Sequence, residues 1–107
     1  MAVIDIHNDS KGWLTLWLEP LGEDRWLKPD EVFRVRSEYK GDELAFSINY
    51  WVDEADPSVQ NINVWIEKGD FYAEVTDRSG AVVECGHQRP QEANRRWQQA
   101  RAAGLGE

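Results

Sequence analysis

The amino-acid sequence predicts an all-β fold: an antiparallel β-sandwich of about seven strands, Greek-key or jelly-roll-like, with one C-terminal α-helix. Three observations lead to this prediction. Apolar and polar residues alternate in several short runs, turn-forming residues separate the runs, and strong helix formers follow Pro90. The length of 107 residues fits one β-sandwich domain that covers residues 1–107.

Seven runs of the sequence have the character of short β-strands. Every second side chain of a strand points to the same side, so alternation is typical of a strand with one buried face. The expected strands are residues 3–7, 13–19, 32–36, 44–52, 61–67, 71–76 and 81–85. The side chains expected to face the core from the three clearest runs are Leu14, Leu16, Leu18, Leu44, Phe46, Ile48, Tyr50, Val52, Ile62, Val64 and Ile66.

The C-terminal helix is expected over residues 90–103, either packed on the sandwich or appended to it. Pro90 suits the first helical position, Glu92 suits the positive end of the helix dipole, and Gly104 suits the stop. A narrow apolar stripe follows the spacing i, i+4, i+7 and consists of Ala93, Trp97 and Ala100.

Charge and composition exclude several classes of protein. The net charge of −8 argues against nucleic acid as a partner, because phosphate binding requires an excess of Lys and Arg. No run approaches the ~18 apolar residues of a membrane span, so we expect no membrane partner. The N-terminus has no basic stretch typical of a signal peptide, and a single Cys suits a reducing compartment. We therefore expect a cytoplasmic protein.

The negative charge is unevenly distributed along the chain. Residues 1–85 contain 8 Lys or Arg and 18 Asp or Glu, a net charge of −10, whereas residues 86–107 contain 4 and 2, a net charge of +2. We expect the basic C-terminal segment to dock on the acidic body, and the acidic body to attract a basic partner.

Tryptophan is the most informative residue type of this sequence, with six copies. Four of them, together with one Tyr, project from the less apolar face of their expected strands, among amide and hydroxyl side chains. These five residues are Trp13, Trp17, Trp51, Trp65 and Tyr72. Trp26 belongs to the stretch 25–29, which we interpret as a loop, and it is either a plug under the sandwich or an exposed anchor.

Three interpretations of this tryptophan-rich face stay open. The helix or a long loop packs over it, with Trp97 meeting the strand tryptophans, since Trp suits half-covered surfaces. Alternatively the face binds a partner protein or a second copy, because Trp and Tyr are common anchors of interfaces. In the third interpretation it is a platform for carbohydrate, with aromatic rings stacking on the ligand and Asn side chains holding its hydroxyls.

Three groups of residues were considered for chemistry, and a structural role is favoured for each. Residues 5–9 place Asp5, His7 and Asp9 on one side of a strand, where they could ligate a divalent cation. Cys85 lies two residues from His87, but its parity indicates a buried, inert thiol. The acidic loop 53–56 could bind calcium, although a solvated loop is the simpler interpretation.

The sequence thus favours a non-catalytic, small, acidic, tryptophan-rich protein-interaction module, such as an inhibitor or immunity-type protein that binds a basic partner. We expect no catalytic residues, no metal and no cofactor. One alternative is a carbohydrate-binding module that uses the strand-face tryptophans. The other is an enzyme that depends on a metal or on its cysteine.

Overall fold

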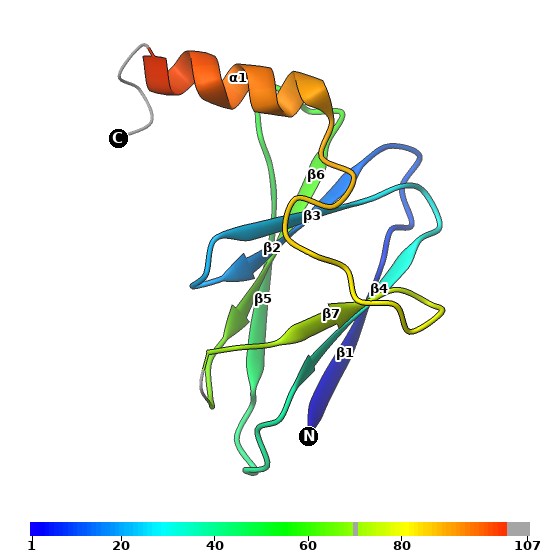
Figure 1. Cartoon of the computed structure of the whole chain (residues 1–107), viewed down its shortest axis with the longest axis vertical. Coiled ribbons are helices and arrows are strands. Elements are labelled where there is room, and N and C mark those ends of the chain that lie inside the picture. The colour runs from blue at the N-terminus through cyan, green and yellow to red at the C-terminus, as the bar shows by residue number, and fades with distance from the viewer. Residues whose placement is uncertain (70, 103–107) are drawn as a thin grey trace.

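In the computed structural model, which describes residues 1–69 and 71–102, two β-sheets pack together and one helix lies at the end opposite the N-terminus (Figure 1). The sandwich-like, mostly β architecture and the C-terminal helix agree with the prediction. The strands of the described chain are β1 (Ala2–His7), β2 (Leu14–Glu19), β3 (Glu23–Leu27), β4 (Val32–Ser37), β5 (Phe46–Val52), β6 (Gln60–Ile66) and β7 (Glu74–Thr76).

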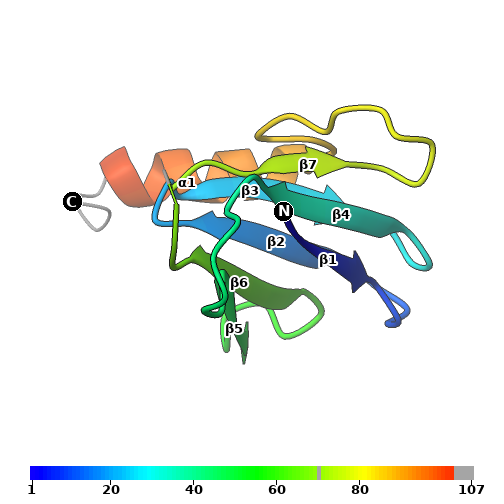
Figure 2. The same ribbon diagram turned by 90° about the horizontal axis from the view of Figure 1, so that it is seen from below.

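The two sheets contain three and four of the described strands and lie as two layers (Figure 2). The smaller sheet has the order β1-β4-β7 and is antiparallel throughout. The larger sheet has the order β3-β2-β6-β5, in which β2 and β6 are parallel and the other pairs are antiparallel. The parallel pair departs from the expected antiparallel pattern. The chain forms β3, β4 and β5 between β2 and β6, and this long connection allows a parallel pair.

The core lies between the inner faces of the two sheets. From the larger sheet it takes the expected alternate residues of β2 and β6, and from the smaller sheet it takes the apolar residues of β4 and β7. The most deeply buried of these are Leu16, Leu18, Phe33, Val35, Val64, Ile66 and Val75. Alternation therefore identified the inward side of β2 and of β6 correctly.

Apart from Phe46, which packs against the core, the inward side of β5 lies outside the core, contrary to expectation. Phe46 is partly buried, but Ile48 is 49% exposed and Tyr50 is 60% exposed. Val52 is also exposed, and so is Leu44, which precedes the strand. β5 is the edge strand of the four-stranded sheet, and its inner side borders two hollows instead of packed side chains. One is lined by Phe46, Ile48 and residues 1–4, and the other includes Tyr50 and His7 in its lining.

The stretch expected to be a loop at residues 25–29 instead contains most of β3. This strand pairs with β2, and Trp26 is buried with 3% of its surface exposed. β3 also buries the charged residues Asp24 and Arg25, which obscure the apolar alternation by which a strand is recognised.

The two strands predicted last are shortened or absent. β7 begins at Glu74, three residues after the expected start at Phe71, whose φ of 60° lies outside the extended region. The segment 81–85 is not a strand and makes a single isolated bridge, between Val82 and Thr76.

The helix α1 (Gln91–Ala102) begins one residue after the expected start at Pro90. The expected last residue, Ala103, and the expected stop at Gly104 lie outside the described residues, as does the side chain of Ala100. No helix in residues 1–69 and 71–102 has the length and apolar character needed to cross a bilayer.

A pair of matched substitutions tests the uncovered position of β5. Ile66→Ala should lower the free energy of unfolding by about 2–5 kcal/mol, because it empties part of a packed core. Ile48→Ala, on the same face of the same sheet, should lower the free energy of unfolding by less than about 1 kcal/mol, since Ile48 is already half exposed to solvent. Urea denaturation of both variants measures the difference, and equal costs would contradict the uncovered edge.

Candidate functional site

Three tryptophans on neighbouring strands share the outer face of the larger sheet, opposite the core. Each indole N–H donates to the side-chain oxygen of an asparagine on an adjacent strand. The pairs are Trp17 Nε1 to Asn61 Oδ1 at 3.0 Å, Trp51 to Asn63 at 2.7 Å and Trp65 to Asn49 at 3.0 Å. These bonds satisfy the polar edge of each ring and fix its orientation. We call this surface the Trp–Asn face, meaning these six residues.

The helix covers one end of the Trp–Asn face. The ring of Trp97 lies 5.7 Å from that of Trp17, and Trp13 meets Trp26 edge-on at 5.9 Å between ring centroids. Ala93 is buried against Trp26 in the same small apolar cluster. Packing beneath the helix thus accounts for Trp13 and Trp17, both of which are partly buried.

The other end of the Trp–Asn face is open. Trp51 is 38% exposed and Trp65 is 37% exposed. Tyr72, 62% exposed, lies in the segment between β6 and β7 rather than on a strand. The five residues proposed from the sequence therefore divide into two covered tryptophans, two open ones and a tyrosine on a connecting segment.

The buried carboxylate of Asp24 attaches the C-terminal segment to the sheet. It accepts hydrogen bonds from the guanidinium of Arg89, at 2.8 Å from Nε, and from the indole of Trp26 at 2.8 Å. Burial raises the pKa of Asp24, but the hydrogen bonds from Arg89 and Trp26 outweigh it and hold the pKa below its ordinary value. Ionised Asp24 therefore stabilises the fold above about pH 4, and this contribution is lost as the pH falls through the lowered pKa.

A second ion pair ties the helix to the loop between β5 and β6. Arg96 Nη1 lies 3.2 Å from Asp56 Oδ2, and Asp56 also accepts a hydrogen bond from the Ser58 hydroxyl at 2.6 Å. The basic C-terminal segment thus docks on the acidic body through Arg89 and Arg96, in the way that the charge distribution led us to expect.

A small pocket of about 80 Å³ lies where the helix, the β5–β6 loop and the Trp–Asn face meet. Its lining combines aromatic rings with charged side chains from loop and helix: Trp17, Trp26, Trp51, Asp53, Asp56, Val59, Asn61, Arg96 and Trp97. Asp53 and Trp51 are exposed, so the pocket opens to solvent on the side of β5.

The two edges of the larger sheet differ in their protection. The segment after β7 covers the edge at β3, where Arg25 forms a parallel bridge to His87 and Trp26 N donates to the His87 carbonyl at 3.0 Å. Among residues 1–69 and 71–102, β5 pairs with β6 on one side and with no strand on the other. Its sequence, FSINYWV, contains no charge and no proline.

The backbone pattern shows which groups of β5 face outward. Glu67 N donates to the Ala45 carbonyl at 2.8 Å, in line with the register that pairs Phe46 with Ile66. Successive residues of an antiparallel strand direct their backbone groups alternately toward and away from the partner. Four residues of β5 therefore direct N–H and C=O groups away from β6: residues 46, 48, 50 and 52.

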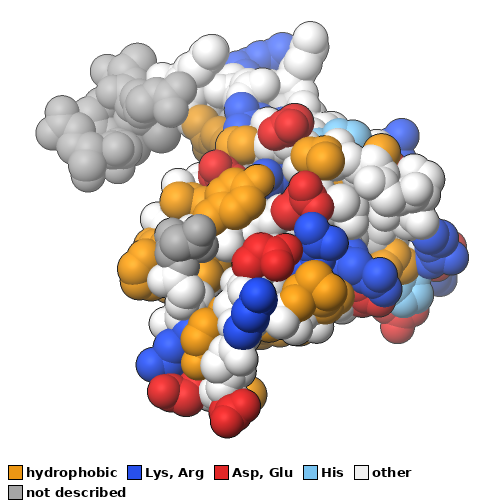
Figure 3. Space-filling view, turned by 60° about the horizontal axis from the view of Figure 1, so that its bottom comes forward, with side chains coloured by type: hydrophobic (Ala, Val, Ile, Leu, Met, Phe, Trp, Pro, Cys, Tyr) orange, Lys and Arg blue, Asp and Glu red, His pale blue; other side chains and the backbone are white. Residues whose placement is uncertain are grey.

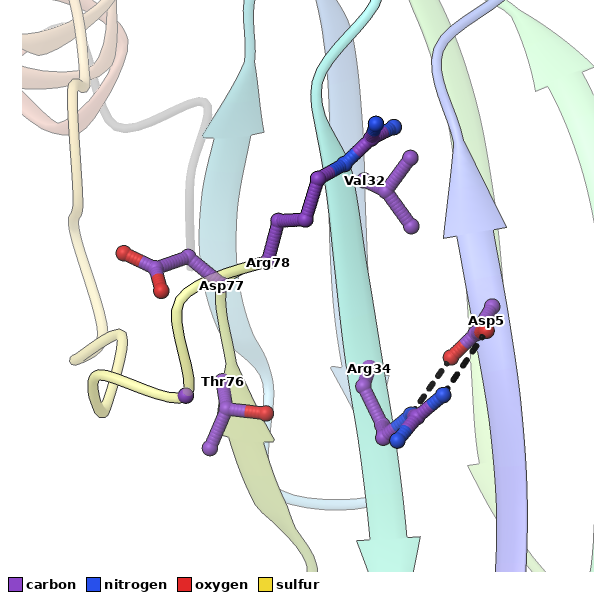
Figure 4. A pocket seen from close by; sticks show the side chains of 7 residues that line it. Asp5, Val32, Arg34, Thr76, Asp77 and Arg78 are labelled. Atoms are coloured by element: carbon purple, nitrogen blue, oxygen red, sulfur yellow. Dashed lines mark hydrogen bonds and ion pairs between the residues drawn. The ribbon is translucent and has the colours of Figure 1, made fainter.

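Two of the three candidate metal ligands in residues 5–9, Asp5 and His7, are engaged in other contacts, and the third, Asp9, is exposed. Asp5 forms a two-pronged ion pair with Arg34, at 2.8 and 3.2 Å, beside a hollow of about 370 Å³ on the smaller sheet (Figure 4). The hydrogen bonds from Arg34 hold the pKa of Asp5 below its usual value. His7 Nε2 lies 3.9 Å from Asp30. Within residues 1–69 and 71–102, no three His, Cys, Asp or Glu residues gather as ligands would.

Cys85 and His87 are also separated in the structure. The Cys85 thiol lies 3.8 Å from an oxygen of Asp24, whereas the His87 ring packs against Phe33 with 5.6 Å between centroids. Cys85 is exposed, contrary to the buried position that its parity indicated. The reason is that 81–85 is not a strand, so parity does not determine which way its side chains point.

Positive and negative side chains are interspersed on the face seen in Figure 3, which includes the lower end of Figure 1. Such a mixed surface is typical of solvated protein. The Trp–Asn face, the adjoining pocket and the open edge of β5 form the more distinctive region.

Comparison with models of protein families, with curated proteins and with solved structures finds no match for this chain. The features of this region are therefore the basis for proposing a function.

Replacing Arg89 tests its role in attaching the helix. Arg89→Met keeps the aliphatic stem but leaves Asp24 buried without its cation, so unfolding should become easier by about 2–3 kcal/mol. This is below the value for a fully buried pair, because the Arg89 side chain is 26% exposed. Arg95→Met is the control. The ion pair of Arg95 with Glu92 is exposed, so its loss should change the free energy of unfolding by no more than about 0.5 kcal/mol. Urea denaturation followed by tryptophan fluorescence measures both variants.

Proposed function

We propose that this chain is a non-catalytic, acidic protein-interaction module that binds a basic partner through β5 and the open end of the Trp–Asn face. The observation that carries the proposal is the exposure of β5. It is an uncharged edge strand of seven residues whose two faces are both largely exposed.

An edge strand of this kind is unusual for a protein that acts alone. Sheet proteins commonly protect their edges with Lys, Pro, a bulge or a covering segment, because free backbone groups pair readily with another chain. The edge at β3 is covered in this way, whereas no segment within the described part of the chain pairs with the outer edge of β5. An extended segment of a partner can add to β5 by backbone hydrogen bonds, while its side chains contact Tyr50 on one face and Trp51 on the other.

The charge of the chain favours a basic partner. The net charge is −8, and the loop that follows β5 contributes the exposed acids Asp53 and Glu54. Such a surface attracts a cationic protein and accelerates its association. An inhibitor or immunity-type protein that blocks a basic target fits this combination, and the free Cys85 fits a reducing, cytoplasmic compartment.

Selection from a random peptide library displayed on phage tests this proposal. Immobilised protein should enrich peptides that alternate apolar residues with others and contain Lys or Arg, because they extend the sheet and neutralise its charge. Tyr50→Pro should lower the affinity for an enriched peptide more than tenfold, since it removes an outward N–H from the edge. Tyr50→Ala, which keeps that N–H, should weaken binding less. Isothermal titration gives the affinities, and circular dichroism checks the fold of each variant.

Two outcomes would count against the proposal. One is that no peptide is enriched, and the other is that the enriched peptides lack any bias to positive charge and tolerate Tyr50→Pro. A mass of two chains in sedimentation equilibrium, reduced to one chain by Tyr50→Pro, would assign the edge to a second copy of this protein instead.

A carbohydrate-binding module is the second candidate function. The observation that favours it is that Trp51 and Trp65 are both exposed and oriented by asparagine side chains. Sugar rings stack on such aromatic faces, and the amides of Asn49 and Asn63 would donate to their hydroxyl groups.

Tryptophan fluorescence distinguishes this candidate from the first. If the face binds sugars, neutral oligosaccharides of glucose, galactose or N-acetylglucosamine should quench the emission saturably. Trp65→Ala should then abolish the quenching without a change in circular dichroism. We expect no saturable quenching, because the proposed partner is a basic protein.

A further inference from the structure

We infer that the pocket between α1 and the Trp–Asn face binds one cationic side chain, the guanidinium or ammonium group of an Arg or Lys of the partner. The inference rests on the proposed function and specifies how a basic partner is recognised. It concerns the pocket of about 80 Å³ described above.

The walls of the pocket suit a cation. Four tryptophans line it, from β2, β3, β5 and the helix: Trp17, Trp26, Trp51 and Trp97. The negative face of an indole attracts a cation within about 6 Å of the ring, and Trp does so best among the aromatic side chains. An apolar group would also enter such a pocket, so the charge of the lining decides between the two.

The charges that line the pocket leave one negative charge uncompensated. Asp53 and Asp56 contribute two negative charges, and Arg96 contributes one positive charge. Arg96 is paired with Asp56 at 3.2 Å. Asp53 accepts a hydrogen bond from Ala55 N at 2.9 Å, and none of the ion pairs among the described residues includes its carboxylate. One monovalent cation restores neutrality, whereas an anion would meet this carboxylate.

The size of the pocket suits the head of a single side chain. A space of about 80 Å³ is several times the ~10–15 Å³ that a water molecule requires by the same kind of measure. A guanidinium or ammonium group fits this space, while a helix or a sugar chain does not.

The protein already uses the same chemistry beside the pocket. The guanidinium carbon of Arg89 lies 5.1 Å from the centroid of the Trp97 ring, and the same group is bound by the carboxylate of Asp24. A partner cation between Trp51 and Asp53 would reproduce this combination of an indole and an aspartate. Because Trp51 belongs both to β5 and to the pocket, a segment that extends the sheet brings its side chains to the entrance.

Small cationic probes test the inference directly. N-acetyl-arginine amide and N-acetyl-lysine amide are titrated into the ¹⁵N-labelled protein, and the indole N–H signals of Trp17 and Trp51 are followed by NMR. At least one probe should shift these signals saturably, and the comparison shows whether guanidinium or ammonium is preferred. N-acetyl-citrulline amide, a neutral analogue of the arginine probe, should not shift them.

Matched variants locate the binding. Asp53→Asn and Trp51→Leu should each lower the affinity for the cationic probe by about threefold or more, as expected for loss of a partly exposed charge or cation–π contact. Asp42→Asn is the control, because it removes the same charge from an exposed loop outside the pocket lining, and it should leave the affinity unchanged. Equal affinity of Asp53→Asn and wild type, or equal shifts with the citrulline probe, would overturn the inference.

The two proposals fail in different ways. If library peptides bind β5 without needing a Lys or Arg, and bind Asp53→Asn as well as wild type, the pocket inference and the preference for a basic partner are overturned, and only the addition of a partner strand to β5 stands. If the cationic probes bind with the predicted variant effects but no peptide is enriched, cation binding by the pocket is supported. The addition of a partner strand to β5 is then contradicted.

Discussion

The attachment of the C-terminal segment to β3 through Asp24 is the interaction on which the rest of the arrangement depends. The side chain of Asp24 accepts from Arg89 and Trp26, and its carbonyl accepts from Gly86 N at 2.6 Å. Arg25 Nε adds a hydrogen bond to the Val83 carbonyl at 2.7 Å, and Gln88 Nε2 one to the Trp26 carbonyl at 2.8 Å. This dense set of contacts closes one edge of the larger sheet and positions the helix over the outer face. A carboxylate this deeply buried is tolerable only because its partners satisfy it.

Closing one edge makes the larger sheet asymmetric. The helix reaches Trp13 and Trp17 through the Trp26 cluster and through Trp97, and it leaves Trp51 and Trp65 open. On the inner side, hollows border β5 and leave Ile48 and Tyr50 exposed. Both faces and the edge of one strand are therefore exposed at the same place. Among the described residues, three features combine to leave this region uncovered: the narrower sheet, a helix that reaches one end of the Trp–Asn face, and a covering segment at β3 but not at β5.

The sequence predicted those parts of the fold that depend on the direction of side chains. Alternation placed Leu16 and Val64 inward, and it placed Trp51 and Trp65 on the opposite face. It could not show that β5 lacks a covering layer, because periodicity reports which side a residue faces and not what lies above it. It also missed β3, where the partners of buried Asp24 and Arg25 lie about sixty residues away in the sequence.

The candidate site was predictable only in part for the same reason. The tryptophans were recognisable by type and parity, whereas their asparagine partners depend on strand order. Trp17 meets Asn61 across the parallel pair β2–β6, a neighbour relation that no local pattern indicates. The pocket depends on even more distant contacts, since its lining comes from four strands, one loop and the helix. Long-range packing, rather than local propensity, thus creates the chemistry of this region.

The net charge of the chain opposes self-association through the open edge. An uncharged edge strand invites pairing with any other strand, including that of a second copy. Two copies would bring together two chains of charge −8 each, with Asp53 and Glu54 at the end of each β5. Their repulsion opposes self-association, whereas the same charges favour a cationic chain. The backbone of β5 offers pairing that does not depend on the partner's sequence, and the acidic, tryptophan-lined pocket adds a preference for positive charge. Affinity and selectivity would then come from neighbouring but separate features, so that a substitution in either one would affect recognition in its own way.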